Sequence, residues 1–457
     1  MSIKIEVPKL LQDIAIAVQE HCGGRVRIVG GYVRDAVRQR YGKDIDCEVF
    51  GVPDLSQLAT LLRPFGQVET VGASFAVIKL RQGDYHFDFA LPRQDRNTGA
   101  GHRDFQVSIH SNLDYETAAS RRDFRMNSLA YDIHNDEILD PFDGLTDIQN
   151  QCIQAIGPAY SEDPLRVLRA MRFAAQLGFT IHPDTLEASR NVDTSALSSE
   201  RVFEELKKIL FSDTPSLGFR YLHDLGLESL FPELADLKGV PQDPEWHPEG
   251  DAWVHTLQAL DAMATLKTGE YNDDLVYLLA VLCHDFGKVP CTQKIDGRWR
   301  AYGHEEASGP LCQRFLDRLT SSSSLKSRVL SLVTHHMRPV FLYSDHKKQR
   351  VSNSAIRRLA TEVSIEDLCI VARADYLGKG DKQLPSEAVD WLLERADDLD
   401  VKAAGPEPIL KGRDLIALGH SPGKAMGSLL DRAYEAQLDD AFSTLEDAKK
   451  WLTNQTS

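Results

Sequence analysis

The sequence predicts an α+β protein in which a head with a small mixed sheet is followed by helical parts. Two observations support this fold class. Residues 25–29 are rich in β-branched side chains and lead into Gly30 and Gly31, a helical stretch and a second strand over 44–50. From Ser161 onward, apolar residues recur at helical spacing. The expected parts are a head over residues 1–150, a helical neck over 151–238, a helical body over 239–385 and a helical tail over 386–457.

Length and composition indicate a soluble protein of several domains. The 457 residues suffice for roughly three or four domains. The longest apolar runs, such as 275–283, are too short to span a bilayer, and no signal peptide is evident, so we expect no membrane partner. The seven cysteines are scattered without a CxxC pair, which favours free thiols in a reducing cytoplasm.

The net charge of −16 disfavours bulk electrostatic binding to nucleic acid. Three local arginine clusters oppose this overall balance. If they converge, they form a basic groove on an acidic body. The clusters are Arg34/Arg38/Arg40, Arg121/Arg122/Arg125 and Arg166/Arg169/Arg172.

The glycine pair and the aspartates after it have the pattern of a phosphate and metal site. Gly30 and Gly31 precede a helix expected over residues 32–41, where backbone amides can approach an anion closely. Asp44 and Asp46 share one face of the next strand, and two adjacent carboxylates suit Mg²⁺ bound to substrate phosphates. A glycine turn or a solvated aspartate pair explains either half alone. Together, in this order, they predict a nucleotidyl-transfer site.

The next segments predict a hairpin and a loop. Residues 75–80 and 85–90 alternate around a Gly-containing turn, and Asp88 either joins the aspartate face or is a simple exposed strand residue. Residues 93–112 are polar, Gly-rich and aperiodic, so we expect a long mobile loop.

A second arginine-rich segment follows the loop. Arg122, Arg125 and Asn127 lie near one another at a helical start, and the planar fork of arginine suits a triphosphate. A solvated arginine face is the alternative at this segment.

Ser161 is expected to cap a helix that carries Asp163 and Arg166. On a helix surface such a pair is ordinarily a weak salt bridge. However, aspartate accepts and arginine donates hydrogen bonds, which complements the pairing edge of cytosine or adenine. The pair would therefore favour CTP and ATP without a nucleic-acid template.

Histidines and aspartates on separate helical segments form a second constellation. A single core histidine is usually structural, but imidazole plus carboxylate on several helices is the ligand set of a divalent-metal hydrolase. A metal-bound water attacking a phosphate ester is the implied chemistry, at one or two metals. The candidate ligands are His255, His284, Asp285, His304, His335, His336 and Asp375, with Asp251 as an optional extra.

These motifs together resemble class II CCA-adding tRNA nucleotidyltransferases that carry an HD domain, over nearly the whole chain. The resemblance implies a polymerase-β-like head, an HD body, and addition of the tRNA 3′-terminal CCA from CTP and ATP. It implies that Asp44 and Asp46 are catalytic and hold Mg²⁺. It also implies a divalent transition metal in the HD domain, with phosphatase or cyclic phosphodiesterase activity. Nucleotide-binding residues would be Gly30, Gly31, Arg34, Arg121, Arg122, Asp123, Asn127, Asp163, Arg166, Arg169 and Arg172.

Some alternatives stay open at this point. The segment Phe124-Arg-Met-Asn-Ser128 departs from the common Thr-Ile-Asn-Ala of the family, and the superfamily includes poly(A) polymerases and separate CC- and A-adding enzymes. Glu162 before the template aspartate and an acidic chain end favour CCA addition. A main activity in the HD domain is the second alternative, and the sequence leaves open whether the protein forms a homodimer.

Overall fold

The computed structural model describes residues 5–71, 77–97, 105–109, 113–380 and 387–456. Contacts divide the chain into two compact units, Met1–Glu205 with Leu217–Leu230 and Leu206–Ser216 with Phe231–Ser457. No helix within the described residues has both the length and the apolar character needed to cross a bilayer.

Unit 1 contains the mixed sheet, as the sequence predicts. Its helices are α1 (Lys9–Cys22), α2 (Gly31–Val37), α3 (Leu55–Leu62), α4 (Tyr115–Ala119), α5 (Gly144–Gln149), α6 (Leu165–Leu177) and α7 (Pro183–Arg190), with the 3₁₀ helices η1 (Arg63–Phe65), η2 (Arg125–Asn127) and η3 (Pro158–Glu162). Its strands are β1 (Arg25–Val29), β2 (Asp44–Phe50), β3 (Gln67–Val71), β4 (Val77–Gln82), β5 (Tyr85–Ala90), β6 (Arg93–Asn97), β7 (Phe105–Ile109), β8 (Ala130–Asp132), β9 (Glu137–Leu139), β10 (Cys152–Ile153) and β11 (Thr180–Ile181). Helices α8 (Ser199–Leu210) and α9 (Ser216–Phe219) each extend across the division between the units.

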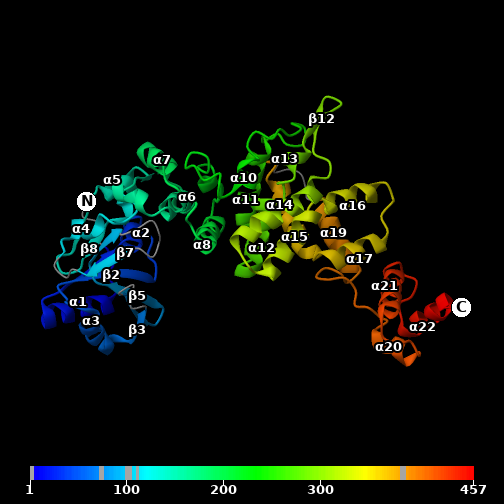
Figure 1. Ribbon diagram of the computed structural model, residues 1–457, viewed down its shortest axis with the longest axis horizontal. Coiled ribbons are helices and arrows are strands. Elements are labelled where there is room, and N and C mark those ends of the chain that lie inside the picture. Colours follow the sequence, from blue (N-terminus) through cyan, green and yellow to red (C-terminus); the bar gives the residue numbers. More distant parts are fainter. Residues whose placement is uncertain (1–4, 72–76, 98–104, 110–112, 381–386, 457) are drawn as a thin grey trace. The chain divides into compact units, whose positions relative to one another are not determined.

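The main sheet has the strand order β3-β4-β5-β2-β1-β8-β9. Only β2 and β5 are parallel within it, and the other neighbours are antiparallel. Helices α1 and α3 pack beside this sheet (Figure 1). The apolar side of α1 is fully buried, so the sheet has a covered face and a core. This parallel pair places Asp46 of β2 directly opposite Asp88 of β5.

Three local predictions need correction. The helix expected over 32–41 ends at Val37, because Gln39 takes a left-handed backbone with φ +61°. The loop expected over 93–112 contains the antiparallel strands β6 and β7, with 98–104 and 110–112 outside the described residues. The two strands pair from Arg93 opposite Ile109 to Asn97 opposite Phe105.

The third correction concerns the start of α6. Ser161 lies in η3 and does not cap α6, which begins at Leu165 after Pro164. Asp163 takes an extended conformation with φ −120° and ψ 106°, as expected of a residue before proline. The helical conformation is therefore interrupted between η3 and α6, and Asp163 lies at this interruption.

Unit 2 is almost entirely helical. Its helices are α10 (Pro232–Ala235), α11 (Ala252–Thr265), α12 (Tyr271–Cys283), α13 (Lys288–Cys291), α14 (His304–Leu319), α15 (Ser323–His335), α16 (Arg338–Lys347), α17 (Asn353–Glu362), α18 (Ile365–Leu377), α19 (Glu387–Asp398), α20 (Gly412–Ala417), α21 (Lys424–Leu438) and α22 (Leu445–Thr456). A short hairpin of β12 (Gln293–Ile295) and β13 (Arg298–Arg300) interrupts them.

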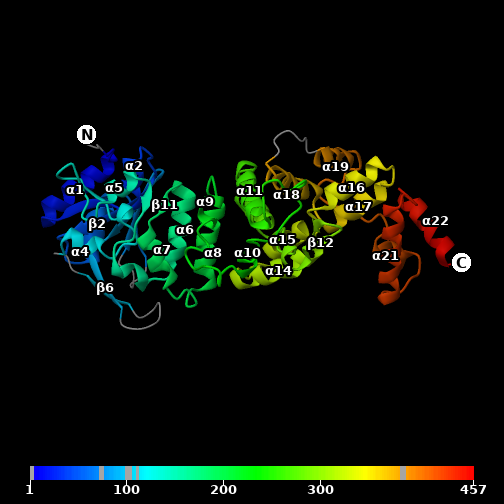
Figure 2. The same ribbon diagram turned by 90° about the horizontal axis from the view of Figure 1, so that it is seen from above.

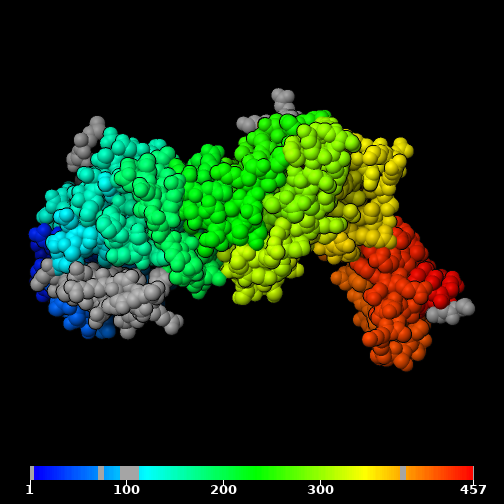
Figure 3. All heavy atoms as spheres, turned by 45° about the horizontal axis from the view of Figure 1, so that its top comes forward, coloured from blue at the N-terminus to red at the C-terminus, as the bar shows by residue number. Residues whose placement is uncertain are grey.

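Helices α11, α12, α14, α15 and α18 form the centre of unit 2 (Figure 2). Helix α12 is apolar on every side and almost completely buried, so the others pack around it. All seven metal ligands predicted for this unit come from these helices or from the one or two residues directly after them. The last three helices, α20 to α22, pack around an apolar cluster of their own, seen as the orange-to-red part of Figure 3.

Candidate functional sites

The carboxylates of the head meet at the parallel strand pair. Asp46 on β2 lies directly opposite Asp88 on β5, and Asp44 is two residues earlier on the same strand. All three line a small cleft of about 150 Å³ that also includes Lys79 and His86. Asp88 therefore does join the aspartate face, which alternation alone left undecided.

The charges at this cleft favour a cation. Desolvation, together with the neighbouring Asp88 and Asp44, raises the pKa of Asp46, and Arg122 opposes the shift. Beside these carboxylates, Lys79 Nζ lies 3.7 Å from Asp88 Oδ2 and His86 Nδ1 lies 3.2 Å from Asp44 Oδ1. A bound divalent cation would remove this repulsion, and oxygen ligands of this kind suit Mg²⁺. The residues therefore fit the ion that the sequence implies.

Beside the carboxylates lies a larger pocket of about 550 Å³, and Asp46 borders both. Six arginines and three aspartates line the larger pocket, so its charge suits an anion such as a triphosphate. Members of all three arginine clusters reach it, so the clusters do converge. Predicted residues that line it are Gly30, Gly31, Arg34, Asp46, Arg122, Asp123, Asn127, Asp163, Arg166, Arg169 and Arg172.

Arg122 enters the pocket over Gly30. Its Nη2 donates to Glu48 Oε1 at 3.1 Å, and a Cβ on Gly30 would lie 2.9 Å from its Nη1. Arg121 was also expected to bind the nucleotide, but it does not line the pocket. Its Nη2 donates to the same Glu48 oxygen at 2.8 Å. Glu48 is buried on β2 and holds both arginines, a role that the sequence analysis missed.

A chain of hydrogen bonds fixes the floor of the pocket. Arg34 Nη1 donates to Asn127 Oδ1 at 2.8 Å, and Asn127 Nδ2 donates to Asp123 Oδ1 at 2.9 Å. Arg169 Nε completes the chain with a 2.7 Å bond to Asp123 Oδ2. Although desolvation raises the pKa of Asp123, Arg169 and these hydrogen bonds lower it overall, so the carboxylate stays ionised. Two arginines are thereby held at fixed positions for a ligand.

Asp163 and Arg166 both line the pocket, and the backbone amide of Arg166 donates to the backbone carbonyl of Asp163 at 3.0 Å. Arg166 donates from Nη1 to the Ala159 carbonyl at 2.5 Å and from Nη2 to the Arg121 carbonyl at 2.6 Å. Asp163 accepts from Arg201 Nη2, at 3.3 Å to each oxygen. Arg201, at the start of α8, is a pocket residue that the sequence analysis missed, as are Phe173 and Gln176. The spacing of Phe173 and Gln176 along α6 could have indicated them.

In unit 2, the predicted metal ligands gather in two adjoining groups of buried side chains. The groups are His255/His284/Asp375 and Asp285/His304/His336. Asp285 lies between them, with Oδ2 3.2 Å from His284 Nε2 and Oδ1 3.4 Å from His304 Nε2. The geometry therefore brings six predicted ligands together around one shared carboxylate.

Hydrogen bonds to the other ring nitrogen orient these histidines. Nδ1 of His284 and of His336 each lie 2.7 Å from a backbone carbonyl oxygen, and Nδ1 of His304 lies 2.8 Å from another. A carbonyl can only accept, so each Nδ1 carries the proton and each Nε2 presents a lone pair. Yet Nε2 of His304 and His336 lie 3.2 Å apart, and Nε2 of His255 and His284 3.3 Å apart. Facing lone pairs repel, so these residues fit divalent metals between them.

Two predicted ligands are corrected. His335 turns away from the groups, with Nε2 2.8 Å from Glu362 Oε2 and Nδ1 2.7 Å from the Ser331 carbonyl oxygen. It is the last residue of α15, one residue before His336, so the two rings face different ways. Asp251 is the N-cap of α11 and accepts from the amide of Val254 at 2.9 Å.

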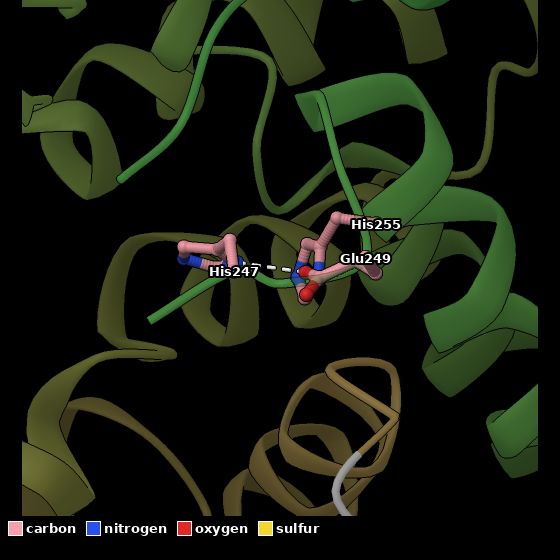
Figure 4. Close-up of side chains that lie close together, drawn as sticks. All are labelled: His247, Glu249 and His255. Carbon is pink, nitrogen blue, oxygen red and sulfur yellow. Dashed lines mark hydrogen bonds and ion pairs between the residues drawn. The ribbon is translucent and has the colours of Figure 1, made fainter. Parts of the chain in front are cut away.

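The sequence analysis also missed residues beside the metal groups. Lys288 Nζ lies 2.7 Å from Asp285 Oδ2. Glu249 Oε1 lies 2.8 Å from Nδ1 of His255 and 2.8 Å from Nδ1 of His247 (Figure 4). The six-residue spacing from Glu249 to His255 gave no helical signal, because Glu249 lies in the loop before α11.

Three models of known protein families match successive parts of the chain. Residues 26–154 match the family model of the poly(A) polymerase head domain. Residues 178–238 match a probable RNA- and SrmB-binding site of polymerase A, and residues 253–379 match the HD domain.

Solved structures with the same fold are CCA-adding enzymes. The Bacillus stearothermophilus enzyme in complex with CTP has a TM-score of 0.66 at 18% identity, and covers 98% of each chain. The Thermotoga maritima enzyme complexed with tRNA has a TM-score of 0.59 at 20% identity, covering 99% of this chain and 97% of that one. At this identity the likeness establishes the fold, so the predicted α+β head with helical parts is confirmed.

Sequence relatives are closer. A multifunctional CCA protein of Xanthomonas campestris pv. campestris is 33% identical over 372 residues, which cover 78% of this chain and 85% of the relative. One from Pasteurella multocida is 38% identical over 306 residues, covering 64% and 70%. The resemblance inferred from the motifs is thereby confirmed, and the chain belongs to the family of multifunctional CCA proteins.

Proposed function

We propose that this protein adds or repairs the 3′-terminal CCA of tRNA, using CTP and ATP without a nucleic-acid template. The observation that carries the proposal is the junction at Asp46, which borders both the carboxylate cleft and the arginine-lined pocket. A triphosphate in the pocket would present its α-phosphate to ions held at the cleft. Relatives named multifunctional CCA proteins support the same substrate.

In this proposal Asp44, Asp46 and Asp88 bind Mg²⁺, which supplies activation of the tRNA 3′-hydroxyl and stabilises the leaving pyrophosphate. The protein's own groups position the nucleotide. Arg122 and the amides of Gly30 and Gly31 hold the phosphates, because charged donors and a helix N-terminus favour an anion.

The choice of nucleotide rests on Asp163 and Arg166. Two backbone carbonyls fix the plane of the Arg166 guanidinium, and its remaining N–H groups can donate to the ring nitrogen of the base. Asp163 accepts from the exocyclic amino group that cytosine and adenine share. Uracil and guanine present the opposite pattern and are rejected.

We propose a second activity in unit 2, metal-dependent hydrolysis of a phosphate ester, for which the two ligand groups around Asp285 would hold divalent transition metals. Imidazole-rich ligation favours such metals over Mg²⁺. Buried Lys288, beside Asp285, would face the negative charge of a phosphate substrate.

The first experiment incubates the purified protein with tRNA lacking its 3′ end, Mg²⁺, and each labelled nucleotide alone and mixed. Addition of two C and one A followed by arrest is the expected result. A long ladder of A alone would instead indicate a poly(A) polymerase. Products ending at CC, or a requirement for a CC end, would indicate a CC- or A-adding enzyme.

A pair of variants separates the two activities. Asp44→Ala should abolish nucleotide addition and leave hydrolysis of a 2′,3′-cyclic phosphate unchanged. His284→Ala combined with Asp285→Ala should have the reverse effect. Hydrolysis as the main function would be favoured if wild-type protein hydrolyses phosphate esters but incorporates no nucleotide.

Two further expectations are kept as proposals. The seven cysteines are all free, which supports a reducing compartment such as the cytoplasm. The division of the chain after residues 150, 238 and 385 can be tested by limited proteolysis, which should cut near those positions first.

A further inference from the structure

We propose that Glu249 is a positioning residue for the metal centre of unit 2, acting through His255. This inference rests on the proposed metal binding by that centre. Glu249 Oε1 lies 2.8 Å from His255 Nδ1 (Figure 4), whereas Nε2 of the same ring lies 2.9 Å from Asp375 Oδ1. His255 is fully buried, and the Glu249 side chain is only 2% exposed.

The hydrogen-bond chemistry fixes the tautomer of His255. Glu249 Oε1 lies 2.8 Å from Nδ1 of both His247 and His255. An ionised carboxylate can only accept, so His255 Nδ1 must carry its proton. The lone pair of His255 then lies on Nε2, which is 2.9 Å from Asp375 Oδ1 and 3.3 Å from His284 Nε2.

His255 differs from the other three buried histidines of the centre in the hydrogen-bond partner of its Nδ1. Those three rely on neutral backbone carbonyls, whereas His255 has a carboxylate partner. A carboxylate increases the basicity of the imidazole and so strengthens its bond to a metal. His255 should therefore be the strongest imidazole ligand of its group.

His247 holds this carboxylate in place. Its Nδ1 lies 2.8 Å from the same Oε1, and its ring stands edge-on to His255 at a centroid distance of 4.9 Å. The loop 243–250 before α11 thus supplies a carboxylate clamped between two imidazoles. Losing the His247 contact should loosen Glu249 without removing it.

The same three residues could instead hold an additional metal, since their ligand atoms lie close together. That arrangement would need His255 to bind one metal through Nδ1 and another through Nε2, as a fully deprotonated imidazolate. A neutral imidazole loses its last proton only at very high pH, whereas both contacts to Glu249 have ordinary hydrogen-bond lengths. The geometry therefore points to a hydrogen-bonded support.

The test measures Ni²⁺ binding to the metal-stripped full-length protein by titration against a competing chelator. Ni²⁺ is the probe because the clustered imidazoles of unit 2 should favour it over the mainly carboxylate ligands of the head cleft. Glu249→Ala should weaken Ni²⁺ binding by about 10- to 100-fold, the usual effect of losing such a partner. Glu249→Gln keeps one acceptor and should restore part of the affinity.

Glu245→Ala is the matched control, because Glu245 lies in the same loop but is exposed and pairs with Arg298. It should bind Ni²⁺ as the wild type does. At saturating Co²⁺, the visible absorption of Glu249→Gln should shift while that of Glu245→Ala matches the wild type, which a merely structural role would not produce. CCA addition by every variant should stay at the wild-type level.

Different failures have different meanings. Wild-type affinity in Glu249→Ala would overturn the positioning role. A loss of one bound ion per chain, with the remaining ions bound as tightly as before, would show an additional metal at His247 and Glu249 and would equally overturn it. Absence of any Ni²⁺ binding by the wild type would instead overturn the proposed metal function of unit 2.

Discussion

Replacing Gly30 by alanine would test whether the glycine pair makes room for Arg122 as well as for phosphate. Gly30 precedes α2 with φ +71° and ψ −131°, a conformation that side chains disfavour. A Cβ there would also lie 2.9 Å from Arg122 Nη1. The substitution therefore has two costs, backbone strain of about 1–3 kcal/mol and displacement of the guanidinium.

Gly157→Ala separates these two costs. Gly157 has a similar backbone, with φ +75° and ψ −155°, but a Cβ there would meet no atom within 4 Å. Both variants should lose about 1–3 kcal/mol of unfolding free energy. Only Gly30→Ala should also lose the contact of Arg122 with the triphosphate. A charged hydrogen bond contributes roughly 1.5–3 kcal/mol, so kcat/KM for CTP should fall by about 10- to 150-fold.

The assays are urea unfolding of both variants and steady-state incorporation of CTP into tRNA lacking its 3′ end. Activity is measured well below the unfolding transition, so that strain alone does not reduce the folded fraction. If Gly30→Ala keeps the kcat/KM of the wild type, or if both variants lose it by the same factor, the role given to the Arg122 contact is refuted.

Three further predictions concern other groups in unit 1. Glu48→Ala leaves buried Arg122 without its carboxylate partner, and urea unfolding should show a loss of about 3 kcal/mol; a loss under 1 kcal/mol would contradict the pairing. Burial raises the pKa of Asp147 to about 6, so in the folded protein its ionisation is unfavourable and stability falls as pH rises from about 4 to 6. Asp147→Asn should therefore stabilise the protein by about 2 kcal/mol more at pH 7.5 than at pH 4.5, and equal gains would refute the shift. Arg201→Ala removes the two hydrogen bonds that Arg201 donates to Asp163, and discrimination of CTP against UTP should fall by about tenfold in competition assays, with unchanged discrimination as the contrary result.

Much of the fold was predictable because its signals are local. The alternation in β1 and β2, the glycine pair and the hairpin of β4 and β5 all appear where the sequence places them. The strands β6 and β7 were missed because backbone hydrogen bonds pair residues 93–97 with residues 105–109, which are not adjacent in the sequence. The parallel register of β2 with β5 is likewise a tertiary property, and no pattern in either strand specifies it.

The candidate sites divide along the same line. Residues whose chemistry shows in their type and spacing, such as Asp44 and His284, were predicted. Residues whose role is to hold another side chain were missed, namely Glu48, Arg201 and Glu249. Their type is common and their partners lie far away in sequence, so only the packed structure reveals them. His335 has the residue type of a metal ligand and was therefore predicted as one. Its position on the helix directs its ring toward Glu362 and away from the ligand groups.

The exposure of the two proposed metal centres predicts different relations between metal and protein. In the head, the Asp44 side chain is 89% exposed, so we expect an ion to arrive with the nucleotide and leave with pyrophosphate. In unit 2, His255, His284 and Asp285 are at most 1% exposed. Facing lone pairs in such a buried space are unfavourable unless a cation lies between them. We therefore expect metal binding in unit 2 to be coupled to the stability of that unit, and metal binding in the head to be coupled to substrate binding.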